Sequence, residues 1–449
     1  MKGKIYWLIL GLVILAIVAV IWLAKTPVIE KPLEIKPQEK PKARVKVAAY
    51  GWSTKSKESE AAEEAVSMVL AKLGKSPDFA FLFSSVVYDE ERLLEEIKAR
   101  LPNTKIYGGT SCLGPMTNDG FHGAEKQSVA IMGISTPEII WGVGGADLNK
   151  LSPKEAGKEA ILAAIKNAGK EVTEKPKIVF MTAAPGMEET ILEGIKDVIG
   201  EDVPIFGGSS GDNTITGEWK QFANDKVYSK GLALAVAYTD LKVGFFYEAG
   251  YPVSEKRGTV TKAEGRVIYE IDGRPAAEVY NEWTGNIFEK QLKEPGRVWG
   301  ILAEATFYPL AKVLRAPGVE PFYLAVHPLD IRPDHSLGVF ADMKKGDEIV
   351  LLHGDWEILL NRFRTTPMKA LETFKIKKGE GLFALYTYCA GTMLAIPEGE
   401  RAKMPLLVKE VIGDIPFIGT FTFGEQGYVP GIGNHHGNLV NSIVIFSQK

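Results

Sequence analysis

The chain has 449 residues, of which 45% are hydrophobic and 24% are charged, and its formal net charge at pH 7 is −3. This length can form more than one hydrophobic core, so two domains are expected. The charge balance, without a basic stripe in the folded part, excludes nucleic acid as an expected partner, and two cysteines, Cys112 and Cys389, exclude a disulfide framework.

The first 24 residues predict a transmembrane signal anchor. Residues 5–24 form an uncharged run with Trp7 and Trp22 near its two ends, and at about 1.5 Å per residue it spans a hydrocarbon core of about 30 Å. A cleaved signal peptide is the alternative, but its apolar region is usually about 7–15 residues long and ends in small residues. Lysines are nearly balanced on the two sides of the run. A short tail before a long domain favours a single-pass protein with an extracytoplasmic soluble domain, anchored through residues 5–24.

A linker is predicted to follow the anchor. Residues 25–46 carry four prolines among lysines and glutamates, a composition that cannot form a core and that favours extended polyproline geometry. The folded part begins at residue 47 with a strand. A helix over 56–73 follows, because apolar residues recur there at helical spacing.

A unit that occurs three times dominates the folded part. Each copy is a buried strand, a helical stretch and a short strand that ends in glycine and small hydroxyl residues, and the copies span 78–111, 177–210 and 381–422. Ligands bind beyond the carboxyl ends of such parallel strands, so these ends are where a site is expected.

The remaining segments extend this pattern to the whole chain. Further helices are expected over 90–100, 151–168, 188–199 and 276–283, and strand pairs over 128–134 with 139–143 and over 232–238 with 242–247. Strands prevail after residue 250, over 265–275, 323–327, 335–341, 348–352 and 439–446. The prediction is an α/β fold of mixed β-sheets flanked by helices, built from repeated strand–helix–strand units, with two halves that form a cleft.

Several phrases of the sequence resemble the FIST family, a bacterial and archaeal sensory module with an N-terminal and a C-terminal half. The N-terminal likeness rests on residues 79–85, 88–89, 101–102, 106–111 and 205–212. The C-terminal likeness rests on residues 272–276, 279–280, 334–337, 389–391, 419–425 and Asn438. The resemblance places the halves at 47–250 and 251–449.

The resemblance implies a function in signal transduction. It implies a domain that binds a small ligand, an amino acid or related metabolite, and reports it to a separate signalling protein. The chain departs from the family pattern at two places, since residues 110–115 lack the usual Gly-Glu after the first glycine turn, and Thr392 replaces an arginine. Family roles of those residues, including ion pairing to a ligand carboxylate, do not carry over.

The candidate ligand-binding residues follow the repeated strands. Glycine turns offer backbone amides to an anionic group such as a carboxylate, although a tight turn that needs positive φ explains them equally well. Glu425 meets a ligand ammonium or holds its own loop by accepting amide hydrogen bonds. The full set is Gly108, Gly109, Thr110, Ser111, Cys112, Gly208, Ser209, Ser210, Asp212, Cys389, Gly424, Glu425, His435 and Asn438.

The alternative function is a cysteine- or serine-dependent hydrolase that uses the same cleft. Residues 207–211 fit the nucleophile-elbow pattern, but a turn-rich segment follows them where that motif requires a helix. Such an enzyme needs a histidine or carboxylate within hydrogen-bond reach of Cys112, Cys389 or Ser209. A purely structural protein is a third possibility, and it would have no polar residues converging in a concave site.

No catalytic residue, metal site or cofactor is predicted. The adjacent His435 and His436 point apart in an extended chain, and no Cys/His spacing fits zinc. Walker loops, dinucleotide fingerprints and paired-carboxylate signatures are also missing from the sequence.

Overall fold

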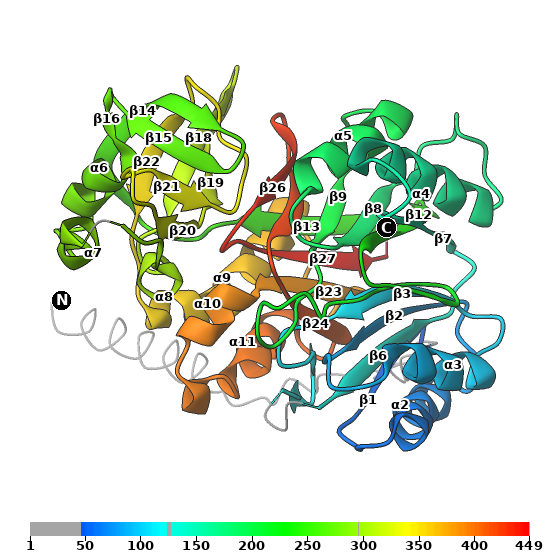
Figure 1. Ribbon diagram of the computed structural model, residues 1–449. Coiled ribbons are helices and arrows are strands. Elements are labelled where there is room, and N and C mark those ends of the chain that lie inside the picture. The colour runs from blue at the N-terminus through cyan, green and yellow to red at the C-terminus, as the bar shows by residue number, and fades with distance from the viewer. Residues whose placement is uncertain (1–45, 124–126, 295, 449) are drawn as a thin grey trace, which may run out of the picture. The chain divides into compact units, whose positions relative to one another are not determined.

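The computed structural model describes residues 46–123, 127–294 and 296–448. They form the predicted α/β fold of mixed sheets flanked by helices (Figure 1). Within these ranges no helix is long and apolar enough to span a membrane. The predicted anchor, and all but the last residue of the predicted linker, lie outside the described residues.

Three six-stranded sheets are each built around one copy of the repeated unit. The two strands of every copy pair in parallel, as the sequence predicted. The pairs are β2 (Phe79–Ser84) with β3 (Lys105–Thr110), β8 (Ile178–Ala183) with β9 (Ile205–Gly208), and β23 (Gly381–Cys389) with β24 (Phe417–Thr422).

Two antiparallel strands extend each parallel pair on one side, in the orders β1-β6-β2-β3, β7-β12-β8-β9 and β13-β27-β23-β24. Their bounds are β1 Ala48–Ser53, β6 Val129–Ile134, β7 Ile139–Asp147, β12 Gly231–Thr239, β13 Lys242–Glu248 and β27 Asn441–Ser447. The two predicted strand pairs, β6 with β7 and β12 with β13, are therefore wrong, because the members of each lie in different sheets. When a short loop connects two apolar strands, the strands can pair as a hairpin or enter two different sheets. Which of these occurs depends on the more distant strands with which each one pairs.

A hairpin from another copy completes each sheet on its other side. The hairpin β10 (Gln221–Ala223) and β11 (Lys226–Tyr228) follows the second copy and pairs with β3 of the first. The hairpin β25 (Glu425–Val429) and β26 (Gly433–Gly437) pairs with β9, and β4 (Met116–Thr117) with β5 (Gly120–Phe121) pairs with β24. This cyclic exchange joins the three units, so two of the sheets contain strands from both sides of residue 250.

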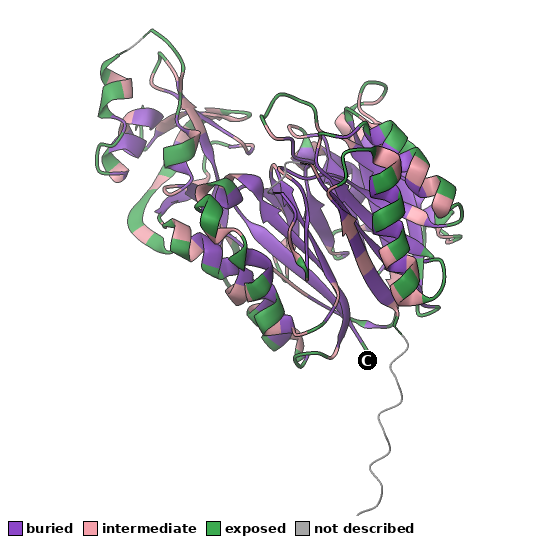
Figure 2. Ribbon diagram, turned by 90° about the horizontal axis from the view of Figure 1, so that it is seen from below, coloured by how far each residue is buried: buried purple, intermediate pink, exposed green. Residues whose placement is uncertain are grey.

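Helices cover the outer faces of the sheets. They are α2 (Glu58–Leu73), α3 (Glu90–Arg100), α4 (Pro153–Asn167), α5 (Glu188–Ile199), α9 (Trp356–Phe374), α10 (Ala390–Ala395), the short 3₁₀ helix Glu398–Glu400 and α11 (Lys403–Ile412). Helix α4 begins with a reciprocal cap, in which Ser152 and Glu155 each bond the other's backbone amide. Figure 2 shows the consequence of such amphipathic helices: the sheets are buried and the helices expose one face.

Each of the three sheets forms one unit together with its helices. In the third unit, residues 253–352 form a β-rich insertion between β13 and α9, which we call the inserted module (Figure 1, upper left). Its core is separate and contains Tyr280, Phe288 and Leu310. The strands are β14 Val253–Glu264, β15 Val267–Ile271, β16 Arg274–Pro275, β17 Trp299–Gly300, β18 Leu310–Ala316, β19 Val319–Val326, β20 Pro328–Ile331, β21 Leu337–Val339 and β22 Glu348–Leu352, and the helices are α6 Ala276–Trp283, α7 Glu289–Lys293 and α8 Leu302–Ala305. The corresponding connections in the other two units, from β1 to α2 and from β7 to α4, have no such insertion.

Candidate functional site

The carboxyl ends of the three parallel pairs meet one another inside the protein. Backbone hydrogen bonds join each copy to the other two, and the residues named next are all buried. These bonds run from Gly211 N to Thr110 O (3.0 Å), from Ser209 N to Gly424 O (2.8 Å) and from Cys112 N to Phe421 O (3.0 Å). Many of the amides that the sequence offers to a ligand are thus used within the protein.

The first predicted turn, residues 108–112, is structural. The Thr110 hydroxyl accepts from a backbone amide, and the Ser111 hydroxyl both donates to and accepts from the backbone. A Cβ at Gly108 would lie 1.7 Å from the Leu82 carbonyl oxygen, and one at Gly109 would lie 2.7 Å from the Ser210 hydroxyl. Burial raises the pKa of the Cys112 thiol to about 12, so this thiol stays protonated.

In the second predicted turn, Ser209 makes a different kind of contact from its neighbours. The Gly208 carbonyl oxygen accepts from Thr182 Oγ1 at 2.8 Å, and Ser210 bonds the same hydroxyl. Asp212 holds the following loop by accepting from the backbone amides of residues 214–218. Ser209 differs, because its hydroxyl donates to Glu188 Oε1 at 2.6 Å.

The third predicted region surrounds Glu425, which is fully buried. Its carboxyl oxygens accept from Thr422 Oγ1 at 2.8 Å and from Val440 N at 3.3 Å. Burial raises the pKa of Glu425 well above its ordinary value and also raises that of the Cys389 thiol, so both groups favour their neutral forms. Glu425 was expected either to bind a ligand ammonium or to hold its own loop, and these contacts match the second role.

The last two predicted residues lie on or just after β26. Asn438 accepts from the His327 amide at 3.2 Å and donates to the Phe340 carbonyl at 3.4 Å, which ties the end of β26 to the inserted module. His435 and His436 are consecutive residues of β26, so their side chains lie on opposite faces of the strand. Burial lowers the pKa of His435. Neither Asn438 nor His435 joins the cluster described next.

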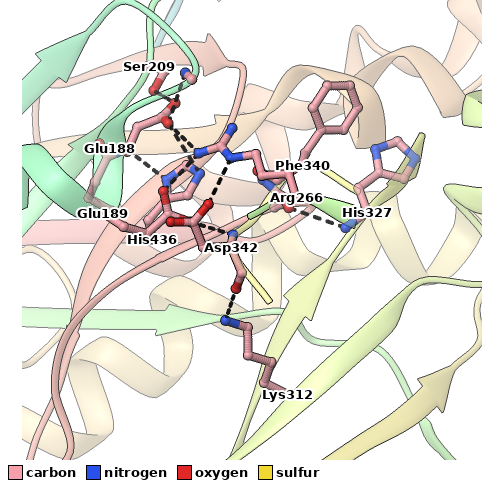
Figure 3. Close-up of polar contacts among 12 residues, drawn as sticks. Glu188, Glu189, Ser209, Arg266, Lys312, His327, Phe340, Asp342 and His436 are labelled. Carbon is pink, nitrogen blue, oxygen red and sulfur yellow. Dashed lines mark hydrogen bonds and ion pairs between the residues drawn. The ribbon is translucent and has the colours of Figure 1, made fainter. Parts of the chain in front are cut away.

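A cluster of charged side chains surrounds Arg266 beside Ser209 (Figure 3). We call it the Arg266 cluster, and its members are Glu188, Glu189, Ser209, Arg266, Asp342 and His436. Glu188 and Glu189 are the first two residues of α5. Arg266 lies between β14 and β15, and His436 lies on β26. The cluster therefore joins the second unit, the third-copy hairpin and the inserted module.

Ion pairs organise this cluster. Arg266 NH2 lies 2.8 Å from one oxygen each of Glu188 and Glu189, and its Nε lies 3.6 Å from Asp342. The Glu188 side chain is 1% exposed, whereas Arg266 is 22% and Glu189 26% exposed. The cluster is thus buried at Glu188 and partly exposed to solvent at Arg266 and Glu189.

The acidic pair is ionised at neutral pH. Burial opposes the charge on Glu188, but His436, Arg266 and the Ser209 hydrogen bond outweigh it, so its pKa is lowered. Burial likewise opposes the charge on Glu189, but the attraction of His436 and Arg266 lowers its pKa to about 2. Two carboxylates thus share one guanidinium, and His436 and Lys312 lie beside them.

His436 supplies an unpartnered nitrogen. Its Nδ1 lies 3.1 Å from Gln426 Nε2, while its Nε2 lies 3.9 Å from Glu188 and has no hydrogen-bond partner in the described part of the chain. Glu188, Glu189 and His436 each place one possible metal ligand within 4.8 Å of the others. A cation would have to displace Arg266, because that guanidinium already binds both carboxylates.

Of the predicted residues, Ser209 belongs to the cluster and Gly424 makes room for it. A Cβ at Gly424 would lie 2.4 Å from His436 Cε1. Glu188 and Glu189 were not predicted as site residues. Their position as an acidic pair shortly after a repeated strand could have indicated them. Arg266 and Asp342 carry no local signal of this kind.

The contacts do not supply an activated nucleophile. Ser209 and Cys389 each have a carboxylate within reach, which are Glu188 and Glu425. The lowered pKa of Glu188 makes it a weak base, and burial and Glu425 raise the pKa of the Cys389 thiol, which favours the protonated form. Within the described ranges no histidine is hydrogen-bonded to Ser209, Cys112 or Cys389.

Two family models match this chain, one after the other. Residues 78–274 match the FIST N domain and residues 276–428 match the FIST C domain. Uncharacterized protein MJ1623 of Methanocaldococcus jannaschii is 36% identical over 90 residues, which are 20% of this chain. The match spans 18% of the length of that curated relative.

Solved structures of cyanuric acid hydrolase align more loosely. The enzyme from A. caulinodans covers 90% of this chain and 99% of its own, with 9% identity and a TM-score of 0.37. A second cyanuric acid hydrolase has the same coverage, 7% identity and a TM-score of 0.31. Likenesses at these TM-scores carry no argument about activity.

Proposed function

This chain belongs to the FIST family, whose domains in general bind ligands as sensors in signalling, and from that premise we propose that it senses a small amino-bearing metabolite. The ligand class is an amino acid or a related compound, and the site is the Arg266 cluster. The sensor is held at the membrane by residues 5–24, with its soluble domain on the extracytoplasmic side.

One observation carries the ligand class: the cluster holds opposite charges in direct contact. An ammonium group suits Glu188 and Glu189, and a carboxylate group suits Arg266, whose Nε has no hydrogen-bond partner in the described chain. Asp342, which is 44% exposed, adds a further carboxylate at the solvent edge. A zwitterion would satisfy both signs at once.

The position of the cluster supports signalling. Arg266 and Asp342 belong to the inserted module, whereas the glutamates belong to α5. A ligand that competes for the partners of Arg266 changes how the module is held, and it shifts only those states that it binds differently. A separate signalling protein then recognises the altered state.

The test is thermal unfolding of the full-length chain in detergent with each of the common amino acids and with small carboxylates. A ligand that binds only the folded state stabilises it by about 2.7 kcal/mol at a hundred times its dissociation constant. The Glu189→Gln variant should lose this stabilisation. Glu193→Gln is the matched control, since Glu193 is exposed on the same helix.

Two results would contradict the proposal. One is an unchanged unfolding midpoint for every compound in the set. The other is an equal ligand response in the Glu189→Gln and Glu193→Gln variants, which would place the site elsewhere.

A further inference from the structure

A hollow of about 570 Å³ lies outside the Arg266 cluster and contains none of the residues predicted from the sequence. Its walls come mainly from β13 and α9 of the third unit, from β19 of the inserted module, and from the end of β25 with the turn after it. This volume is in the range of small-molecule sites, about 300–1,000 Å³.

Aromatic residues and prolines together make up most of its lining residues. Eight of the nineteen lining residues are aromatic and three are proline. The rings of Tyr247 and Phe322 stack across the junction with β19, with centroids 5.8 Å apart and planes 18° apart. Phe322, Tyr323 and Tyr428 stay partly exposed. Flat apolar faces that remain open to solvent in a concave place indicate a ligand with a flat apolar body.

The accessible charge beside the hollow is positive. Glu248 is 11% exposed, and both its oxygens are occupied, one by Thr366 Oγ1 at 2.9 Å and the other by Lys369. The Lys369 side chain is 41% exposed, and its ammonium lies 5.4 Å from the Phe246 ring centroid. An ammonium has three donors, so Lys369 can still bind an anionic group.

We propose that this hollow binds an aromatic small molecule with an anionic substituent. The ring packs against the aromatic walls, and the carboxylate, sulfonate or phosphate group binds Lys369. This site is separate from the Arg266 cluster and does not depend on the amino-acid proposal. Because its walls belong to both the third unit and the inserted module, an occupant adds contacts between them.

The experiment is ligand binding to the full-length chain in detergent, measured by saturation-transfer NMR and titration. The probes are cinnamate, 1-naphthoate and indole-3-acetate, each compared with its neutral amide. The acid should bind more tightly than the amide, by about fivefold, as expected for a partly exposed charge pair of about 1 kcal/mol. Detergent alone gives the background signal.

Variants test the contribution of the aromatic wall and that of the Lys369 charge separately. Lys369→Gln should abolish the preference for the acid, and Lys369→Arg should retain it. Tyr323→Ala should weaken both acid and amide, by about tenfold. Lys262→Gln and Tyr269→Ala are matched controls, because Lys262 lies 5.2 Å from the Tyr269 ring in the inserted module outside the hollow.

The proposal is overturned if none of the probes binds, or if acid and amide bind equally well to the unmodified protein. It is also overturned if the variants Tyr323→Ala and Tyr269→Ala affect binding to the same extent. Glu189→Gln should leave probe binding unchanged, so failure here is distinguishable from failure of the amino-acid site.

Discussion

Two buried carboxyl groups follow strands of two different sheets and differ in charge. Glu188 follows β8 and Glu425 follows β24, and both are almost completely buried. Glu188 has a guanidinium at 2.8 Å and stays ionised, whereas Glu425 has a hydroxyl and an amide as hydrogen-bond donors and favours the neutral form. The comparison teaches that a partner from a distant segment, and not the local repeat, decides the charge of a buried carboxyl group.

The largest expected effect comes from removing the partner that keeps Glu188 ionised. Arg266→Ala leaves a buried carboxylate without its cation, so it should lower the free energy of unfolding by about 3–5 kcal/mol in urea. Arg274→Ala is the matched control, since Arg274 forms an exposed ion pair in the same module, and it should change stability by less than about 1 kcal/mol. Adding Glu188→Gln to Arg266→Ala should recover part of the loss. Equal effects of the two arginine variants would refute this account.

Because Glu425 favours its neutral form in the folded state, the stability of the protein should fall as pH rises. The folded-state pKa of Glu425 is raised to about 8 from an ordinary value of 4.5, so between these values the native state binds more protons than the unfolded state, and stability is lost with rising pH. Glu425→Gln should remove this loss, so that the variant gains on the order of 2–4 kcal/mol relative to the unmodified protein between pH 5 and 8. Urea unfolding at several pH values measures it. A constant difference between the two proteins over this range would show that Glu425 is ionised when folded.

The hydroxyl that binds the ionised carboxylate should matter less than the guanidinium. Ser209→Ala removes a hydrogen bond to a charged, buried group, so a loss of about 1.5–2 kcal/mol in the free energy of unfolding is expected. Ser56→Ala, at an exposed serine, is the control and should change stability by less than about 0.5 kcal/mol. An effect of Ser209→Ala no larger than that of the control would mean that Glu188 does not need this donor.

The smallest expected effect is on the acid side. The pKa of Glu189 is lowered to about 2, so its contribution is present above the ordinary value of 4.5 and is lost as pH falls towards 2. Glu189→Gln should flatten the acid limb of the stability curve by about 1 kcal/mol, because the side chain is partly exposed and screened by solvent. Urea unfolding between pH 2 and 6 measures the limb. An acid limb as steep as that of the unmodified protein would assign the loss to other carboxylates.

Local features of the fold were predictable. The helices α3 and α5 have the predicted bounds, and all three repeated strand pairs are parallel. Apolar spacing and acidic helix starts operate over a few residues, and such signals survive in any tertiary context. The strand pairs β6–β7 and β12–β13 were mispredicted, because their pairing depends on partners far away in the chain.

The candidate site was predictable only in part. Ser209 and Gly424 were named from the sequence because they follow repeated strands, which is where ligands approach such sheets. Arg266 lies 78 residues from Glu188 in the sequence, and Asp342 lies 153 residues from Glu189. No spacing rule connects residues at such separations.

The sequence by itself determined the repeated unit, its buried strands and the glycine-rich ends, since periodicity and chain flexibility are local properties. Only the tertiary structure decided that the three units exchange hairpins, that their ends close on one another, and that the inserted module brings Arg266 to Glu188. Sheet pairing and the desolvation of a charge both depend on which distant segments come together, and that is set when the whole chain packs.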